Sequence, residues 1–249
     1  MGPQEVNRDR TRPAFYAARP GAWRDWWTLL HPPYTAWHLS YVVVGACLAP
    51  AVMVSRLLAT LLAFFLAVGV AAHAYDEVQD RPLRTQIPAW ALVTACVGGL
   101  AGALALGVLG VLEAGLVLVP FLVVGPFLVV AYNADLFAGA FHTDLGFALS
   151  WGAFPVLTAY VAQAGNVSGG ALLAAAAATV LSLAQRSLST PARQLRRRVV
   201  DVRGKVVLAD GSERRLDREQ LLQPLERGLR NVAWAAVLFA TALAVFRLG

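Results

Sequence analysis

The chain has 249 residues, of which 58% are hydrophobic and 14% charged, and its formal net charge at pH 7 is +6. Soluble domains average roughly 25% charged residues, so this composition excludes an ordinary soluble protein and indicates that most of the surface faces lipid. The two cysteines, Cys47 and Cys96, both lie in apolar runs, which excludes a disulfide framework.

Seven apolar runs are long enough to cross a bilayer, whose hydrocarbon core of about 30 Å needs roughly 20 helical residues. Lipid cannot hydrogen-bond the backbone, so helices are expected throughout these runs. The predicted spans are 35–54, 57–75, 88–111, 114–132, 145–164, 169–186 and 229–247. The sequence therefore predicts an all-α, polytopic transmembrane helical bundle of about seven spans.

Polar segments divide the chain into four predicted parts. These are a cytoplasmic or interfacial N-terminal arm, a six-span bundle, a basic cytoplasmic insert and a last transmembrane helix, over residues 1–34, 35–186, 187–228 and 229–249. Within the insert, residues 199–211 are typical of a short β-hairpin, with a first turn at Gly204 and a second at Asp210-Gly211. Residues 216–229, which include Pro224, are expected to form a short amphipathic helix.

Basic residues predict the orientation in the membrane. If the spans are correct, 19 of the 21 Lys and Arg side chains fall on one side, and Arg56 and Arg247 fall on the other. Cytoplasmic loops carry the excess of Lys and Arg in membrane proteins. We therefore expect an integral plasma-membrane protein whose N-terminus is cytoplasmic and whose C-terminus is not.

A stripe of polar residues is expected at the cytoplasmic end of the second span. His73, Asp76, Glu77 and Asp80 have the i, i+3, i+4, i+7 spacing of one helix face. Charged groups at such depth are costly, so they usually face a cavity, a partner or a metal. The alternative is that they mark the water boundary. Further acids and histidines on the same side are Asp135, Asp144, His31, His38 and His142, of which the first two histidines are expected to be interfacial.

Three stretches of the chain resemble the UbiA-type intramembrane prenyltransferases. Residues 31–35 (HPPYT) and Gly45 are similar to the opening of that family. Residues 72–81 (AHAYDEVQDR) fall where the family has its first aspartate-rich motif, N-D-x-x-D-x-x-x-D. Tyr132-Asn133, followed by WGAFP at 151–155, resembles the stretch after the fourth span. The resemblance covers residues 29–186.

This resemblance implies transfer of a prenyl group from a lipid diphosphate to an unknown acceptor. It assigns Asp76 and Asp80 to the last two aspartates of the motif, with His73 in place of the first. Mg²⁺, or another divalent metal, would be bound by these three side chains and would assist the leaving diphosphate. The residues implied to bind substrate are Arg84, Tyr132 and Asn133.

The second aspartate motif of the family, expected after the sixth span, is missing here. After Asp144 the next acidic residue is Asp201, and the family usually has nine spans rather than seven. Arg186 and Arg193 would replace the missing cluster, since arginine binds phosphate bidentately. They would share a face only if the helix continued past Pro191, which is not expected. The alternative is that these arginines contact anionic headgroups.

Three functions remain open from the sequence. The first is a prenyltransferase-like enzyme whose partners are membrane lipid and a prenyl diphosphate, without nucleic acid. The second is another membrane metalloenzyme with mixed nitrogen and oxygen ligands for Zn²⁺, Mn²⁺ or iron; its ligands would be His73, Asp76, Glu77, His142 and Asp144. The third is a non-catalytic lipid-binding or assembly protein on the same fold.

Overall fold

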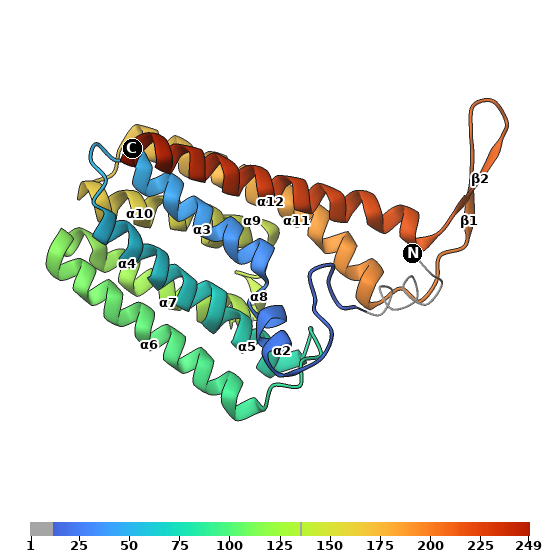
Figure 1. Ribbon diagram of the computed structural model, residues 1–249, viewed down its shortest axis with the longest axis horizontal. Coiled ribbons are helices and arrows are strands. Elements are labelled where there is room, and N and C mark those ends of the chain that lie inside the picture. Colours follow the sequence, from blue (N-terminus) through green and yellow to red (C-terminus); the bar gives the residue numbers. More distant parts are fainter. Residues whose placement is uncertain (1–11, 135) are drawn as a thin grey trace.

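The computed structural model describes residues 12–134 and 136–249 and shows a bundle of long helices with one small hairpin (Figure 1). In chain order the elements are α2 (Ala22–Leu29), α3 (Pro32–Cys47), α4 (Val54–Phe64), η1 (Phe65–Ala72), α5 (His73–Asp80), α6 (Ala89–Ala114), η2 (Leu116–Leu118), α7 (Val119–Asn133), α8 (Leu136–Gly139), α9 (Asp144–Ala148), η3 (Leu149–Ala153), α10 (Phe154–Ala164), α11 (Gly169–Arg197), β1 (Gly204–Val207), β2 (Glu213–Leu216) and α12 (Arg218–Leu248).

Six helical stretches of the described chain are long and apolar enough to cross a membrane. They are Val54–Asp80, Ala89–Ala114, Leu116–Asn133, Asp144–Ala164, Gly169–Arg197 and Arg218–Leu248. The first predicted span, 35–54, is instead the 16-residue α3, which is only about 24 Å long at 1.5 Å per residue. Pro32 begins α3, and the chain leaves the helix after Cys47, before Pro50. The predicted count of seven therefore becomes six full-length spans and one short helix.

The short helix α3 occupies the interior of the bundle, packed against both α10 and α12. Trp37 and Tyr41 of α3 form a buried cluster with Val156 and Ala233. At Gly45 a Cβ atom would lie 2.2 Å from the carbonyl oxygen of Val156. Only glycine permits this approach of the two backbones, so α3 and α10 are held at a fixed depth relative to each other.

Two long helices contain a π-helical segment where they face the centre. The stretch Val54–Asp80 contains η1, and Asp144–Ala164 contains η3. Gly152 in η3 brings that segment against α11, since a Cβ atom there would lie 2.6 Å from Ser182 Oγ. Single π-helical turns occur frequently at functional sites. Both segments contribute side chains to the cavities described below.

Helices α11 and α12 extend past the rest of the bundle at one end (Figure 1). The expectation that α11 stops before Pro191 is wrong, because the helix continues through that proline to Arg197. The separate helix predicted over 216–229 is likewise the first part of α12, which passes through Pro224. Buried packing of Ala192, Leu222 and Leu229 stabilises both extensions and outweighs the cost of an internal proline.

Polar contacts also join α11 and α12 at this end. The carboxylate of Glu226 forms an ion pair with the guanidinium of Arg196, and both side chains are buried. Arg218 donates hydrogen bonds to the backbone carbonyls of Leu195 and Arg196 over 2.7 and 2.9 Å. Those carbonyls belong to the last turn of α11, which has no helical partner for them. The predicted boundaries at 186 and 229 consequently fall inside continuous helices.

The predicted hairpin is present, with one of its two predicted turns. Strands β1 and β2 pair antiparallel, with Gly204 opposite Leu216 and Val207 opposite Glu213. The turn is therefore at Asp210-Gly211, where Gly211 has φ +81°, and the turn predicted at Gly204 is wrong. Asp210 Oδ1 accepts hydrogen bonds from the backbone and hydroxyl of Ser212. The hairpin projects beyond the bundle (Figure 1).

Candidate functional site

A polar cavity of about 290 Å³ opens at the end of the bundle that carries the hairpin. Its walls come from the segment before α2 and from α3, η1, α5, α7, α9, η3, α11 and α12. They combine carboxylates, arginines, histidines and aromatic rings. The titratable residues lining it are Tyr16, His31, Tyr34, His38, His73, Asp76, Asp80, Tyr132, His142, Arg186, Arg193, Arg196, Arg197 and Glu226.

Asp76 and Asp80 lie one turn apart on α5, and both side chains are exposed and line the cavity. Their spacing on one helix face is the one expected from the sequence. Two neighbouring carboxylates repel each other unless a cation lies between them. This pair is accordingly the cavity's acidic wall.

Glu77, which the sequence placed in the same stripe, turns away from the cavity and is fully buried. Its Oε2 accepts a hydrogen bond from the backbone N–H of Leu83 over 2.9 Å. Its Oε1 accepts from the N–H and the hydroxyl of Thr85 over 2.8 and 2.9 Å. Glu77 therefore fixes the loop after α5 and is not placed to bind a metal in the cavity.

His73 lines the cavity one turn before Asp76. Its Nδ1 lies 3.1 Å from the carbonyl oxygen of Gly69, and its ring stacks on that of His31 with centroids 4.1 Å apart. His31 Nδ1 in turn lies 2.7 Å from the hydroxyl of Tyr16. Burial, and then the neighbouring His73, lower the pKa of His31 well below 6.5.

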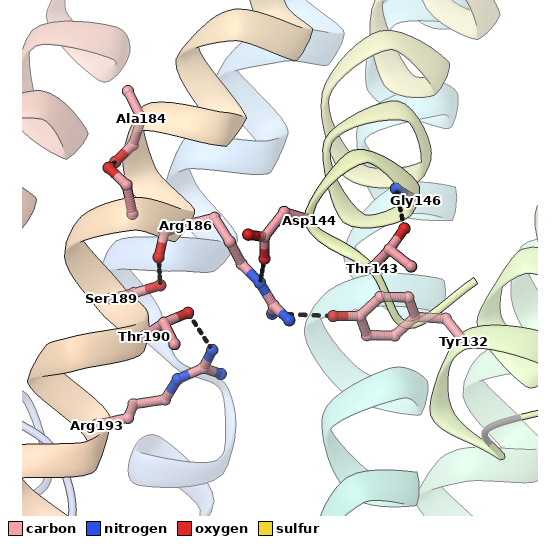
Figure 2. Close-up of polar contacts among 10 residues, drawn as sticks. Tyr132, Thr143, Asp144, Gly146, Ala184, Arg186, Ser189, Thr190 and Arg193 are labelled. Atoms are coloured by element: carbon pink, nitrogen blue, oxygen red, sulfur yellow. Dashed lines mark hydrogen bonds and ion pairs between the residues drawn. The ribbon is translucent and has the colours of Figure 1, made fainter. Parts of the chain in front are cut away.

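Arg186 lines the cavity and is 9% exposed. Figure 2 shows it reaching from α11 toward Asp144 and Tyr132. Its Nε donates to Asp144 Oδ1 over 2.9 Å, and its Nη1 donates to the Tyr132 hydroxyl over 3.0 Å. The guanidinium also lies 5.0 Å from the ring centroid of Phe147. Two helices, α7 and α9, thus orient one arginine of α11, and Asp144 is engaged in an ion pair with it.

Arg193 lies two turns further along α11 and also lines the cavity. Because α11 continues through Pro191, Arg186 and Arg193 do share a face, as Figure 2 shows. The Arg193 side chain is exposed, and its Nη2 donates to Thr190 Oγ1 over 3.5 Å. Arg197 donates to the carbonyl of Pro13 over 3.3 Å. Arginines of α11 and the acidic pair of α5 therefore line the same cavity.

Of the other predicted substrate contacts, Tyr132 and Asn133 line the cavity, whereas Arg84 is not among its lining residues. Tyr132 binds Arg186, and its ring stacks on His142 at 4.5 Å. Asn133 Nδ2 donates to the carbonyl of Val129 within its own helix. Arg84 is exposed in the loop after α5, with φ 55°. Asp135 lies outside the described residues.

Sequence reasoning missed His38, which was expected to be interfacial. It is 8% exposed, lines the cavity, and its Nδ1 lies 2.9 Å from the carbonyl oxygen of Trp151. The available signal was its spacing: His31 and His38 are seven residues apart, which is two helical turns. A second missed residue is Gln185, which is 6% exposed beside Arg186.

A second, apolar cavity of about 240 Å³ adjoins the polar one. It lies among α4, η1, α6, α7, η3 and α10, and Val68 and Trp151 line both cavities. Phe64, Phe121 and Phe154 form part of its aromatic wall. A molecule with a charged head and a long apolar tail would therefore have a place for each part.

The described residues contain no cluster of three or more His, Cys, Asp or Glu side chains suited to a metal ion. With Glu77 and Asp144 engaged elsewhere, the mixed-ligand metalloenzyme hypothesis has no support. Asp76 and Asp80 nevertheless fit Mg²⁺, which proteins usually bind through one or two carboxylates together with substrate phosphates and water. The two aspartates therefore suit a metal ion whose remaining ligands are phosphate oxygens of a bound molecule and water.

No protein-family model matches the sequence, and no curated protein is significantly similar to it. Among solved structures, a UbiA homolog from Archaeoglobus fulgidus, with bound Cd²⁺, aligns with a TM-score of 0.50. The alignment covers 88% of this chain and 83% of that one, at 16% sequence identity.

The chain has a UbiA-like fold. At this identity the likeness establishes the fold alone, and it confirms the all-α membrane bundle predicted from the sequence. Two of the predicted spans, 57–75 and 145–164, contribute Val68, Ala72, Phe147 and Trp151 to the polar cavity.

Proposed function

We propose that this protein is an integral membrane prenyltransferase-like enzyme, which transfers a prenyl group from a lipid diphosphate to an acceptor. The observation that carries the proposal is the junction of the two cavities at Val68 and Trp151. A charged cavity next to an apolar one matches the two chemically distinct halves of a prenyl diphosphate. The UbiA-like fold supports the same assignment.

The diphosphate would bind between α5 and α11. Arg186 and Arg193 would donate hydrogen bonds to its oxygens, since a guanidinium matches phosphate geometry. Asp76 and Asp80 would hold a divalent cation, Mg²⁺ being the first choice for carboxylate ligands. Such an ion stabilises the charge that develops on a leaving phosphate. The Cd²⁺ in the A. fulgidus UbiA homolog supports a divalent ion in proteins of this fold. His73 as a third ligand stays a prediction.

Arginine on α11 takes the place of a second carboxylate cluster in this proposal. A second metal ion would need carboxylates on that helix, and α11 contains none. A fixed guanidinium supplies positive charge directly, and Arg186 is already oriented by Asp144 and Tyr132. The protein would therefore neutralise a diphosphate with one cation and two arginines.

The prenyl chain would lie in the apolar cavity, with its reactive carbon at the junction. The rings of Phe147 and Trp151 line the polar side of this junction. Positive charge developing on that carbon is attracted to aromatic faces. The surrounding walls keep bulk water from the reacting carbon, which would otherwise be hydrolysed.

We also propose that the polar cavity opens to the cytoplasm. It lies at the end of the bundle that carries the basic hairpin, and Arg56 and Arg247 lie at the other end. Arg247 donates to the carbonyl of Ala49, and Arg56 to that of Glu113. The excess of basic residues at the cavity end supports this orientation, because cytoplasmic segments of membrane proteins carry the excess of Lys and Arg.

The proposal is tested by binding geranylgeranyl diphosphate to the purified protein in detergent, with Mg²⁺, and measuring Kd. Arg193→Gln should weaken binding by roughly 10- to 150-fold, the equivalent of about 1.5–3 kcal/mol for a charge-assisted hydrogen bond. Arg198→Gln is the matched control, because Arg198 follows α11 and is not among the cavity-lining residues. Equal affinity of both variants and the parent would refute the phosphate site and favour headgroup contacts.

The second candidate function is a non-catalytic lipid-binding or assembly protein, which the missing carboxylate cluster favours. It predicts that geranylgeranyl diphosphate binds but is never cleaved. Release of pyrophosphate from bound geranylgeranyl diphosphate, in the presence of candidate acceptors, therefore separates the enzyme from the binding protein.

A further inference from the structure

His38 presents an unused hydrogen-bond acceptor to the polar cavity. Its Nδ1 lies 2.9 Å from the carbonyl oxygen of Trp151, and a carbonyl can only accept, so Nδ1 carries the hydrogen. In a neutral imidazole the other nitrogen, Nε2, then carries the lone pair. Among the described residues, no side chain or backbone group donates a hydrogen bond to Nε2. His38 is thus held as the Nδ1–H tautomer, and its Nε2 can accept a hydrogen bond from a ligand.

His38 also lies where the two cavities meet. Its ring centroid is 6.4 Å from that of Trp151 and 6.2 Å from that of Phe147. Trp151 lines both cavities, whereas His38 lines only the polar one. The imidazole is therefore on the polar side of the junction at which the proposed function places the reactive carbon.

A second unused acceptor lies on the opposite helix. Gln185 is 6% exposed, lines the polar cavity, and its Oε1 is buried without a hydrogen-bond partner. Buried polar atoms are normally satisfied, so each exception needs an explanation, a missing ligand among them. The Nε2 of His38 and the Oε1 of Gln185 each require a donor of their own, because one O–H carries a single hydrogen. A bound hydroxyl supplies the donor for Nε2, and Gln185 Oε1 accepts from a second donor group of the same molecule.

The packing of α3 on α11 brings these two residues to the same depth. Ser182 Oγ donates to the Tyr41 hydroxyl over 3.2 Å, which fixes the register of the two helices. One turn further toward the polar cavity, α3 presents His38 and α11 presents Gln185, three residues from Tyr41 and Ser182 respectively. The two helices run in opposite directions, so both steps lead the same way.

We infer that His38 binds the hydroxyl of the acceptor molecule and takes its proton at Nε2, and that Gln185 Oε1 accepts a hydrogen bond from a second donor group of that molecule. The inference rests on the proposed function and adds the acceptor side of the site. As the acceptor oxygen bonds to the prenyl carbon, the carbon–oxygen bond to the diphosphate breaks and its electron pair leaves with the diphosphate. The hydroxyl proton passes to Nε2, which gives an imidazolium whose Nδ1–H still donates to Trp151.

The first test uses geranylgeraniol and its methyl ether, in which a methyl group replaces the hydrogen of the O–H donor. The chain fills the apolar cavity in both, and the head reaches the junction. The parent protein should bind the alcohol roughly tenfold more tightly, the size of one hydrogen bond. This preference should vanish in His38→Asn, which keeps an N–H donor for the Trp151 carbonyl but has no acceptor in the place of Nε2. It should persist in Gln185→Leu, which removes only the second acceptor.

The outcomes separate this inference from the proposed function. Equal affinity for alcohol and ether in the parent, or a preference that persists in His38→Asn or is lost in Gln185→Leu, overturns the inference. If geranylgeranyl diphosphate still binds in that case, the proposed function stands. If the parent binds the alcohol preferentially but not the diphosphate, the hydroxyl site stands and the proposed function fails. Binding of none of the three probes would overturn both.

The second test addresses the free lone pair and needs no ligand to bind. Diethyl pyrocarbonate reacts with unprotonated imidazole nitrogen, and peptide mass spectrometry identifies the residues modified. His38 should be modified through the open cavity, at Nε2, in spite of its low exposure. Prior addition of a nonhydrolysable geranylgeranyl thiolodiphosphate should reduce the modification. An unmodified His38 in folded protein would show that Nε2 is not available and would overturn the inference.

Discussion

The role of Glu77 gives the sharpest prediction for the stability of the site. Its carboxylate accepts three hydrogen bonds from Leu83 and Thr85, and the side chain is fully buried. Hydrogen bonds to charged groups contribute about 1.5–3 kcal/mol each. The low end for three bonds gives about 4.5 kcal/mol, and water entering the loop would recover part of it. We therefore expect Glu77→Ala to lower the free energy of unfolding by about 3–4 kcal/mol.

The assay is thermal unfolding of the purified protein in detergent, where this loss corresponds to roughly 10 °C. Asp80→Asn is the matched control, because Asp80 lies on the same helix with an exposed side chain and should change stability by less than about 0.5 kcal/mol. Equal midpoints for the two variants would refute the structural role of Glu77. Destabilisation of the parent by EDTA to the level of Glu77→Ala would instead indicate a bound metal.

Three further predictions concern packing, pH and topology. Gly152→Ala should lower the free energy of unfolding by about 1–3 kcal/mol, because it overpacks η3 against α11. Gly98→Ala is the control and should not lower it, since a Cβ atom there meets nothing within 4 Å; the unfolding midpoints of the two variants are compared. Burial lowers the pKa of His31 in the folded protein, so below pH 6.5 the His31 imidazole takes up a proton only in the unfolded chain, and the free energy of unfolding should fall as the pH drops. Unfolding midpoints measured from pH 8 to 5 should depend less steeply on pH in His31→Asn. A reporter inserted near Gly211 should be cytoplasmic and one after Gly249 not; both on one side would contradict the topology.

The bundle and its acidic wall could be predicted because they follow from local patterns. Apolar runs of helical length predicted the spans, and the i, i+4 spacing of Asp76 and Asp80 predicted that they share a helix face. The same logic failed at Glu77, because its burial depends on two N–H groups and a hydroxyl in a loop that no periodicity describes. The orientation of Arg186 was equally hidden, since Asp144 and Tyr132 come from two other helices.

Proline was the main source of error in the helix boundaries. Pro191 and Pro224 both lie inside continuous helices, although each removes a backbone donor. Their helices pack against each other at that end, and the buried cluster there outweighs the local cost. The consequence for function is direct, because the continuation of α11 is what brings Arg193 to the cavity. Contacts between two helices that are distant in the sequence cannot be inferred from the local pattern around each proline.

His38 shows the remaining limit of sequence reasoning. Its position near the start of a span suggested an interfacial residue, yet α3 is drawn into the bundle between α10 and α12. The close approach at Gly45 sets this depth, and it depends on the backbone of Val156. The sequence contained the glycine and the histidine, but their relation to α10 exists only in the folded protein.

The central claim is that the polar cavity binds a diphosphate whose prenyl chain enters the apolar cavity. The most direct test is an experimental structure of the protein with geranylgeranyl thiolodiphosphate and Mg²⁺. We predict that the diphosphate lies between the carboxylates of Asp76 and Asp80 and the guanidinium groups of Arg186 and Arg193, with the chain passing Trp151. A diphosphate bound instead at Arg198 or on the hairpin, with both cavities empty, would contradict the account.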